Sequence, residues 1–404
     1  MYNEVLILVE DLCLSIANKA LTQLGMIAPN RNIHDIFNKE LEREQQYDRN
    51  ALSAYLQANE PFLNTEQKRV YDTIMHAVNT GSGGFYFLDA LGGTGKTFVM
   101  SLILDNIRAN GFIALAIASS GIAATLLEGG CTAHSALKLP LNLQVNEEPT
   151  CNISKRSGMA RVLQQCNIII WDECTMAHKK SLEELNRTLK DLRENQRLFG
   201  NALILLTGDF RQTLPVIPRS TPADELNACL KASNFWRYVT KLTLNTNVRV
   251  QLQNDSSAEV FSKQLLQIGN GRIPIDNNGL FKFPDHFCQI AESRADLVQK
   301  VFPDITQNYK NHNWLSERAI LAGTNKDVNE INADILDKIP GDTVVYRSVY
   351  TIIDQDQVVN YPTEFLNSLD ISGFPPHYLQ LKPTPNQKLV KFVVKMNSNE
   401  VRTN

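Results

Sequence analysis

The chain has 404 residues, more than one hydrophobic core usually serves, so about two or three domains are expected. Its hydrophobic fraction of 43% and charged fraction of 21% are ordinary for a globular protein, and a net charge of −3 argues against a strongly basic nucleic-acid coat protein. Hydroxyls, backbone N–H groups and a locally basic groove can still hold nucleic acid. Seven scattered cysteines without a CxxC pair predict reduced thiols and a protein that is not secreted.

Residues 1–60 are expected to form a helical segment. An amphipathic helix is predicted from Met1 through Leu24, and the carboxylates within it argue against a secretory leader or a membrane span. The charged run at residues 40–46 predicts a solvated helix, and a domain boundary is expected near Pro61.

After residue 64, helix-like segments alternate with short apolar runs. These runs are Phe85–Leu88, Ile113–Ala118, Ile168–Trp171 and Leu203–Thr207. Apolar runs of this length predict strands of a parallel sheet that is buried on both faces, and therefore an α/β fold with helices on each side.

Two further patterns follow along the chain. Leucines at positions 182, 185, 189 and 192 predict a helix packed into the core, with Ser181 and Glu184 forming a capping box at its start. The polar run Gln251–Ser257 predicts a connector into a second region.

Residues 89–97 read Asp-Ala-Leu-Gly-Gly-Thr-Gly-Lys-Thr, between a predicted strand and a predicted helix. The N–H groups of such a turn point into one concavity, and the helix N-terminus adds partial positive charge. Lys96 can reach the β and γ phosphates, and the Thr97 hydroxyl can ligate Mg²⁺. The stretch predicts a nucleoside triphosphate site made by Gly92, Gly93, Thr94, Gly95, Lys96 and Thr97. This motif alone does not separate kinases, GTPases and motors.

Two carboxylates, Asp172 and Glu173, end the apolar run that begins at Ile168. In an open parallel sheet this end lies at the same edge as the glycine-rich turn. Asp172 is expected to hold Mg²⁺, usually through water, and Glu173 to orient and deprotonate an attacking water. The alternative is a solvated acidic strand end. The pair favours hydrolysis over phosphoryl transfer to a metabolite.

Two glutamines are candidates for reading the nucleotide. Gln212 follows the run that ends at Thr207 and can bond the γ-phosphate or the attacking water. Gln67 lies in the first turn of a predicted helix and has the donor and acceptor that an adenine edge requires.

Together these motifs resemble the PIF-type superfamily 1 DNA helicases, and especially the helicase module of Helitron-type transposons. The matching segments, in family order, are residues 92–97, 119–124, 132–135, 171–173, 208–215, 244–249, 320–325 and 361–366. Residues 1–60 resemble the segment that precedes the helicase module in those transposon proteins.

The resemblance implies a RecA-like ATP-binding domain at residues 61–250, between the N-terminal helical segment 1–60 and a partial second motor domain at 251–404. It implies Mg²⁺-dependent ATP hydrolysis that drives 5′-to-3′ movement on single-stranded DNA and unwinding of forked duplex. The associated processes are DNA repair, recombination, telomere maintenance and transposition, with nuclear residence if the source is eukaryotic.

The resemblance also assigns roles. Gln67 would recognise adenine, Gln212 would sense the γ-phosphate, and Arg249 would be an arginine finger acting with Lys96 and Glu173. Thr132, His134 and Ser135 match a motif that contacts DNA, and hydroxyls with an imidazole suit a sequence-independent grip on phosphate. The alternative for this segment is an ordinary helix cap. Cys131 stands where these helicases commonly carry arginine.

The family continues beyond its match at Tyr361–Lys382 with a late DNA-contacting motif and a second arginine finger, and residues 383–404 resemble neither. The expectation is a chain truncated within its second motor domain. The alternative function is a transposon-derived remnant that binds ATP, and DNA, without productive unwinding. A small-molecule kinase is a further alternative, which the Gly208–Pro215 motif disfavours.

Overall fold

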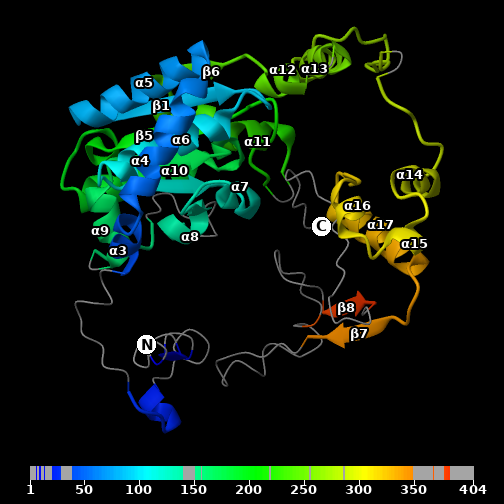
Figure 1. The fold of residues 1–404 in the computed structure, drawn as a ribbon, viewed down its shortest axis with the longest axis horizontal. Helices are drawn as coiled ribbons and strands as arrows, with labels where there is room; N and C mark the ends of the chain where they lie inside the picture. The colour runs from blue at the N-terminus through cyan, green and yellow to red at the C-terminus, as the bar shows by residue number, and fades with distance from the viewer. Residues whose placement is uncertain are drawn as a thin grey trace. The chain divides into compact units, whose positions relative to one another are not determined.

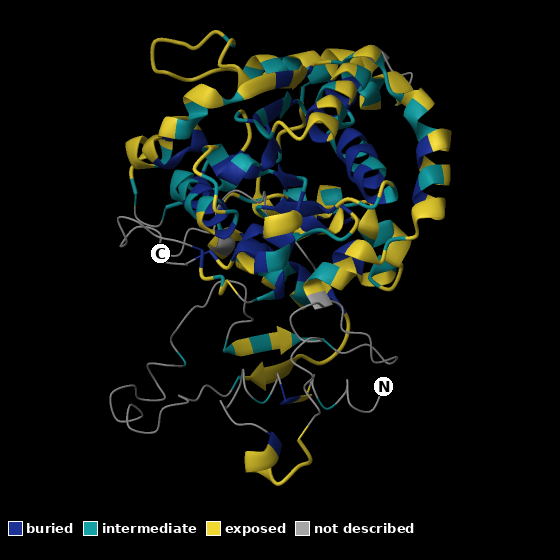
Figure 2. Ribbon diagram, turned by 90° about the vertical axis from the view of Figure 1, so that its left-hand side faces the viewer, coloured by how far each residue is buried: buried dark blue, intermediate teal, exposed yellow. Residues whose placement is uncertain are grey.

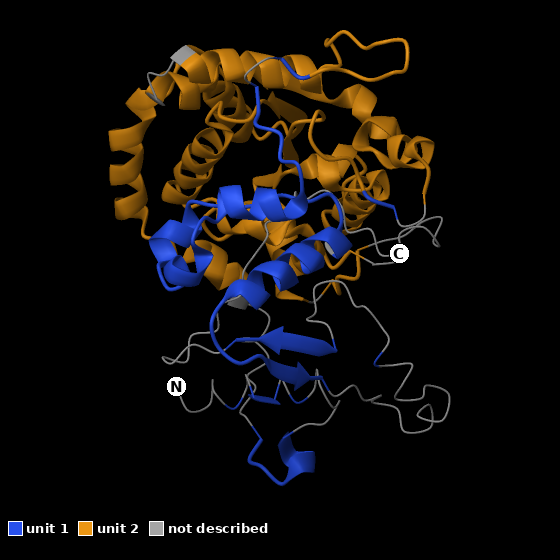
Figure 3. Cartoon of the chain, turned by 90° about the vertical axis from the view of Figure 1, so that its right-hand side faces the viewer, with its two compact units in different colours: residues 1–30, 216–219, 283–404 blue, residues 31–215, 220–282 orange. Residues whose placement is uncertain are grey.

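The computed structural model describes residues 21–28, 39–139, 151–155, 157–217, 220–253, 256–284, 287–348 and 377–382, with Leu6, Val9, Glu10, Cys13 and Asn367. Most of the predicted helix Met1–Leu24, the Tyr361–Leu366 motif and residues 383–404 lie outside the described residues. The chain divides into a larger unit, residues 31–215 and 220–282, and a smaller unit, residues 1–30, 216–219 and 283–404 (Figure 3). The bounds of the three predicted domains remain a prediction. In the described part of the chain, no helix has the length and apolar character needed to cross a membrane.

The larger unit is built from helices and one sheet. Its strands are β1 (Gly84–Ala90), β2 (Ala114–Ala118), β3 (Cys131–Thr132), β4 (Ile168–Asp172), β5 (Leu203–Gly208) and β6 (Thr240–Leu244). Its α-helices are α3 (Lys39–Gln45), α4 (Arg49–Asn59), α5 (Thr65–Thr80), α6 (Lys96–Ala109), α7 (Gly121–Thr125), α8 (Ala133–Leu137), α9 (Gly158–Gln165), α10 (Lys179–Leu192), α11 (Pro222–Ala228), α12 (Val248–Gln253) and α13 (Ser256–Gly269). Its 3₁₀ helices are η2 (Glu60–Phe62), η3 (Cys174–Met176), η4 (Leu198–Asn201), η5 (Leu230–Ala232) and η6 (Asn234–Tyr238).

All six strands are parallel, in the order β3-β2-β4-β5-β1-β6. Strands β1, β5 and β6 of this sheet are labelled in Figure 1. Side chains alternate between two hydrophobic clusters: Phe87 of β1 packs with residues of α8, α9 and α10, and its neighbour Leu88 packs with residues of α4, α5 and α6. The buried residues therefore gather between helices whose outer faces are exposed (Figure 2). The predicted α/β fold, with a parallel sheet buried on both faces, is confirmed.

Helix α10 confirms one prediction and corrects another. Its four predicted leucines are buried. The helix begins at Lys179 rather than near Ser181, because the His178 ring accepts a backbone N–H of the first turn, 3.1 Å from Nδ1. Ser181 and Glu184 are buried within the helix, so the predicted capping box is wrong. The predicted connector at Gln251–Ser257 is also wrong, since its described residues belong to α12 and α13.

Within the larger unit, α3 packs next to α9, and α4 packs next to α6. Arg108 of α6 is 2% exposed, and its guanidinium lies 4.2 Å from the centre of the Tyr47 ring and donates to the Glu128 carbonyl at 2.8 Å. The far end of α6 is thereby held by Tyr47, which precedes the helix in sequence, and by Glu128, which follows it.

The smaller unit has its own core. Its described elements are η1 (Leu21–Leu24), α14 (Arg294–Val301), α15 (Ile305–Asn308), α16 (His312–Ser316), α17 (Asn325–Lys338) and the antiparallel pair β7 (Val344–Arg347) and β8 (Tyr378–Leu381). Buried side chains of α14, α15 and α17, among them Val298, Ile305 and Ile335, form this core. The motif at residues 320–325 leads into α17, where the Thr324 hydroxyl caps the helix.

Candidate active site

The glycine-rich turn joins β1 to α6. Gly93 and Gly95 have φ angles of 83° and 77°, a region that glycine enters without steric cost. A Cβ on Gly95 would lie 2.4 Å from Nε2 of Gln67, and one on Gly93 would lie 2.6 Å from Oδ1 of Asn247. Both glycines are therefore favoured by conformation, and a side chain at either position would also displace a neighbouring amide side chain. Gly92 has no such neighbour within 4 Å.

The turn leaves donors available at the start of α6. The Thr94 hydroxyl donates to the Leu91 carbonyl at 2.8 Å and holds the turn closed. No side chain caps the 14-residue helix that follows, so the N–H groups of its first turn, which includes Lys96 and Thr97, can bind an anion.

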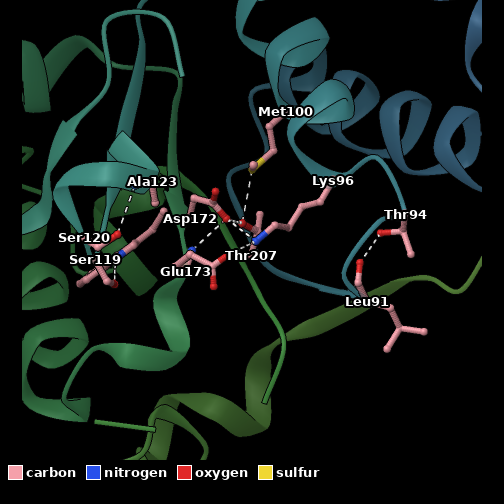
Figure 4. A network of polar contacts seen from close by, with 11 residues as sticks. Leu91, Thr94, Lys96, Met100, Ser119, Ser120, Ala123, Asp172, Glu173 and Thr207 are labelled. Carbon is pink, nitrogen blue, oxygen red and sulfur yellow. Dashed lines mark hydrogen bonds and ion pairs between the residues drawn. The ribbon is translucent and has the colours of Figure 1, made fainter. Parts of the chain in front are cut away.

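Lys96 is held between the two acids at the end of β4. Its Nζ lies 2.7 Å from Oδ1 of Asp172 and 2.6 Å from Oε1 of Glu173 (Figure 4). Asp172 is 2% exposed. Burial lowers the pKa of Lys96, but the two carboxylates outweigh it and raise the pKa above its usual value. The structure thus brings together the lysine and both acids that the sequence singled out.

Glu173 has an unusual backbone. Its φ of 48° and ψ of 39° place it in the left-handed region, which costs a residue other than glycine about 1–3 kcal/mol. Its N–H donates to Oδ1 of Asp172 at 2.8 Å, and 3₁₀ helix η3 begins directly after it. This conformation turns the chain sharply at the strand end, so that both acids meet Lys96.

The oxygen donors here fit Mg²⁺. A hydroxyl at Thr97 and a carboxylate at Asp172 are hard ligands of the kind that this ion prefers. The Lys96 ammonium against Asp172 shows that a cation is stabilised at this place. Among the described residues, no group of three or more His, Cys, Asp or Glu side chains could hold a metal alone. Phosphate and water oxygens would complete the coordination, as is common for Mg²⁺.

Thr207 is a residue of the site that the sequence did not single out. Its side chain is fully buried on β5, and its hydroxyl donates to Oδ1 of Asp172 at 2.6 Å. The bond fixes the carboxylate that Lys96 contacts. The only sequence signal is a hydroxyl near the end of an apolar strand adjacent to the acid-ended strand.

Replacing Thr207 by valine keeps the shape and removes the hydroxyl. We expect the free energy of unfolding to fall by about 1.5–3 kcal/mol, as for a buried hydrogen bond to a charged group, measured by urea denaturation. Thr240→Val, on an exposed position of β6, is the matched control and should leave stability nearly unchanged. Equal stability of Thr207→Val and the unmodified chain would contradict a contribution from this bond.

Gln67 is 3% exposed and both polar ends of its side chain are engaged. Oε1 accepts the Asn64 N–H at 3.0 Å, and Nε2 donates to the Thr94 carbonyl at 2.9 Å. The amide thereby ties the first turn of α5 to the glycine-rich turn. Recognition of adenine by Gln67 remains a prediction, and it requires these bonds to rearrange.

Gln212 and Arg249 follow β5 and β6 at the same edge of the sheet. The Gln212 N–H donates to the Asp209 carbonyl at 2.9 Å, and the Arg249 N–H donates to the Gly93 carbonyl at 3.0 Å. Both side chains are exposed, and neither makes a hydrogen bond or ion pair within the described part of the chain. Their predicted roles at the γ-phosphate remain predictions.

The predicted DNA-contacting segment lies at the end of β3. The Thr132 hydroxyl accepts the Ser135 N–H at 3.3 Å, so Thr132 caps α8, and His134 and Ser135 are exposed. Desolvation lowers the pKa of His134 below its usual value. The two hydroxyls and the imidazole can offer hydrogen bonds to phosphate, and contact of the segment with DNA remains a prediction.

A family model described as PIF1-like helicase matches residues 62–279, which is just over half of the chain. The chain belongs to the PIF1-like helicase family. The matched range contains every residue placed above at the sheet edge, from Gln67 to Arg249.

Two proteins that this chain resembles are named as Pif1 helicases. ATP-dependent DNA helicase Pif1 of Psychrobacter sp. (strain PRwf-1) is 27% identical over 277 residues, which cover 69% of this chain and 38% of that protein. ATP-dependent DNA helicase PIF1 of Candida albicans is 26% identical over 311 residues, which cover 75% of this chain and 31% of that protein. The chain therefore spans between 31% and 38% of the length of these relatives.

Solved PIF1-like structures share the fold. The crystal structure of Pif1 helicase from Candida albicans matches with a TM-score of 0.50 and 21% identity, covering 80% of this chain and 63% of that one. A crystal structure of Bacteroides Pif1 bound to ssDNA has a TM-score of 0.50, 19% identity and the same coverage, 80% and 63%. The predicted RecA-like fold is confirmed by this likeness.

Proposed function

We propose that this chain hydrolyses ATP with Mg²⁺ and couples hydrolysis to movement along single-stranded DNA. The observation that carries the proposal is the contact of Lys96 with Asp172 and Glu173 at the edge of the sheet where the glycine-rich turn lies. The names of the relatives, ATP-dependent DNA helicases, support ATP and DNA as ligands.

The site is arranged for an exchange of partners by Lys96. Phosphate oxygens entering the turn would accept hydrogen bonds from the N–H groups of the first turn of α6. They would also attract the Lys96 ammonium away from the two acids. Asp172, oriented by Thr207, would then hold Mg²⁺ together with Thr97, and the ion would neutralise phosphate charge. Glu173 would be released to accept a proton from the attacking water. ATP binding and the freeing of the general base are thus one event.

Gln212 and Arg249 complete the proposed mechanism. Charge grows on the γ-phosphate oxygens in the transition state, and a guanidinium and an amide are suited to stabilise it. Both side chains are unengaged in the described part of the chain, so neither must break a bond to reach the phosphate.

We further propose 5′-to-3′ movement and unwinding of forked DNA, in which Thr132, His134 and Ser135 contact the single-stranded DNA. DNA repair, recombination, telomere maintenance and transposition are the processes in which such an activity serves, in the nucleus if the source is eukaryotic. The resemblance to PIF-type helicases supports this part of the proposal.

The test is stimulation by DNA. Single-stranded DNA is expected to raise the steady-state ATPase rate by about tenfold or more, because DNA that binds the conformation competent for hydrolysis better than other conformations raises the population of that conformation. Heparin, a polyanion without bases, is the control and should not stimulate. A 5′-tailed duplex should be unwound and a 3′-tailed duplex should not.

Each negative result has its own meaning. Hydrolysis that DNA leaves unchanged would contradict the helicase proposal, because the remnant and the kinase alternatives both predict no stimulation by DNA. Binding of ATP and DNA without unwinding of either tailed duplex would favour the remnant.

A further inference from the structure

Glu66, in the first turn of α5, binds a loop that lies far away in sequence. Its Oε2 accepts the backbone N–H of Asn245 at 2.8 Å and that of Thr246 at 3.1 Å. These two hydrogen bonds lower the pKa of Glu66 below its usual value. The loop begins where β6 ends and leads directly to Arg249.

The same loop is fixed at two other places. The Asn247 side chain accepts the Val250 N–H at 3.2 Å and donates to the Ser262 hydroxyl of α13 at 3.1 Å. The Arg249 N–H donates to the Gly93 carbonyl at 3.0 Å. The backbone from 245 to 249 is therefore tied to α5, α13 and the glycine-rich turn, while the Arg249 guanidinium stays free in the described part of the chain.

Adjacent residues of α5 divide this task. Gln67 bonds the Thr94 carbonyl, and Glu66 bonds the loop that carries Arg249. Their helical turn is itself fixed, because the Asn64 and Gln67 side chains cap each other's backbone N–H groups at 2.9 and 3.0 Å. One rigid turn thus sets the position of two segments that, in the proposed function, would face the phosphates of ATP.

We propose that Glu66 is a positioning residue that holds the Arg249 loop in register with the glycine-rich turn. The inference rests on the proposed function, in which Arg249 acts on the γ-phosphate. Glu66 touches none of the groups assigned to phosphate or metal, so its loss should slow turnover without weakening nucleotide binding. If the loop loosens and Arg249 is displaced, its guanidinium no longer stabilises the charge that develops on the γ-phosphate in the transition state.

The test compares three variants of the full chain. Glu66→Ala is expected to lower kcat by about ten- to a hundredfold and to leave the Kd for a non-hydrolysable ATP analogue within about twofold. Glu66→Gln should retain most activity, because both N–H groups bond one oxygen and an amide oxygen can accept both. Asp72→Ala removes an acid of the same helix whose ion-pair partner is Lys68, and should change nothing.

A double-mutant cycle separates positioning from a general structural effect. In an Arg249→Ala background, Glu66→Ala should lower kcat by no more than about twofold further, because the group it positions is already gone. Multiplicative effects of the two changes, or an analogue Kd that rises in proportion to the loss of kcat, would overturn the proposal.

Amide hydrogen exchange reads the tether without any turnover. The Asn245 and Thr246 amides should exchange faster in Glu66→Ala and at the original rate in Glu66→Gln. Unchanged exchange of these two amides in Glu66→Ala would overturn the proposal that Glu66 holds the loop. If the unmodified chain protects both amides but hydrolyses no ATP, only the proposed function is contradicted. If Glu66→Ala does not fold, Glu66→Asp replaces it in every comparison: its shorter reach should give the same direction of change in kcat and exchange, and no change would overturn the proposal.

Discussion

Lys96→Ala is expected to abolish ATP hydrolysis, with kcat falling by at least about 10³-fold. In the proposed mechanism the ammonium neutralises the β and γ phosphates, and alanine leaves that charge without a partner. A steady-state phosphate-release assay with saturating ATP and single-stranded DNA measures the loss. Lys96→Ala that keeps more than a tenth of the original kcat would contradict the role of Lys96.

The same substitution should also destabilise the ligand-free chain. Asp172 is buried and Lys96 is its counter-charge. Removal of the Lys96 ammonium should therefore lower the free energy of unfolding by about 3 kcal/mol, as for a broken buried ion pair. Lys68→Ala is the matched control, since Lys68 also contacts two carboxylates, Glu60 at 2.6 Å and Asp72 at 3.0 Å, but on the surface. Its cost should be about 0–1 kcal/mol. Similar urea midpoints for the two variants would show that the Lys96 cluster stabilises nothing.

Glu173→Gln is expected to keep ATP affinity and to lose turnover. Binding depends on phosphates and metal, whereas the glutamine amide cannot take the proton of the attacking water, and the loss of a general base lowers kcat by about 10²–10⁴-fold. Equilibrium binding of a fluorescent ATP analogue and single-turnover hydrolysis measure the two effects separately. The analogue Kd should stay within about threefold.

Glu194→Gln is a control matched in backbone as well as in chemistry. Glu194 also has a left-handed φ, 50°, but it is exposed beyond the C-terminal end of α10. This variant should hydrolyse ATP at the original rate. A tenfold weaker affinity in Glu173→Gln would mean that this residue binds nucleotide rather than activates water.

The central sheet could be predicted from sequence because β1, β2, β4 and β5 are buried on both faces and therefore read as apolar runs. The edge strands could not. Only Leu242 and Leu244 of β6 are buried, and β3 has two residues, so neither strand reads as a continuous apolar run. The start of α10 was misplaced because a local serine-to-glutamate spacing indicated a cap, whereas a histidine further upstream supplies it.

The contacts of the site also fall into those that the sequence could predict and those that it could not. The meeting of Lys96 with Asp172 and Glu173 follows from strand topology, since carboxyl ends of parallel strands share one edge. The bond of Thr207 to Asp172 and that of Glu66 to Thr246 join residues 35 and 180 positions apart through common side chains. No spacing rule connects them, and only the folded chain brings them together.

Isothermal titration calorimetry of Mg-ATP into the folded Glu173→Gln chain tests the central claim most directly, because binding is then observed without turnover. The account predicts saturable uptake of one nucleotide per chain that requires Mg²⁺ and is lost when EDTA is added. A folded chain that takes up no ATP in the presence of Mg²⁺ would contradict it.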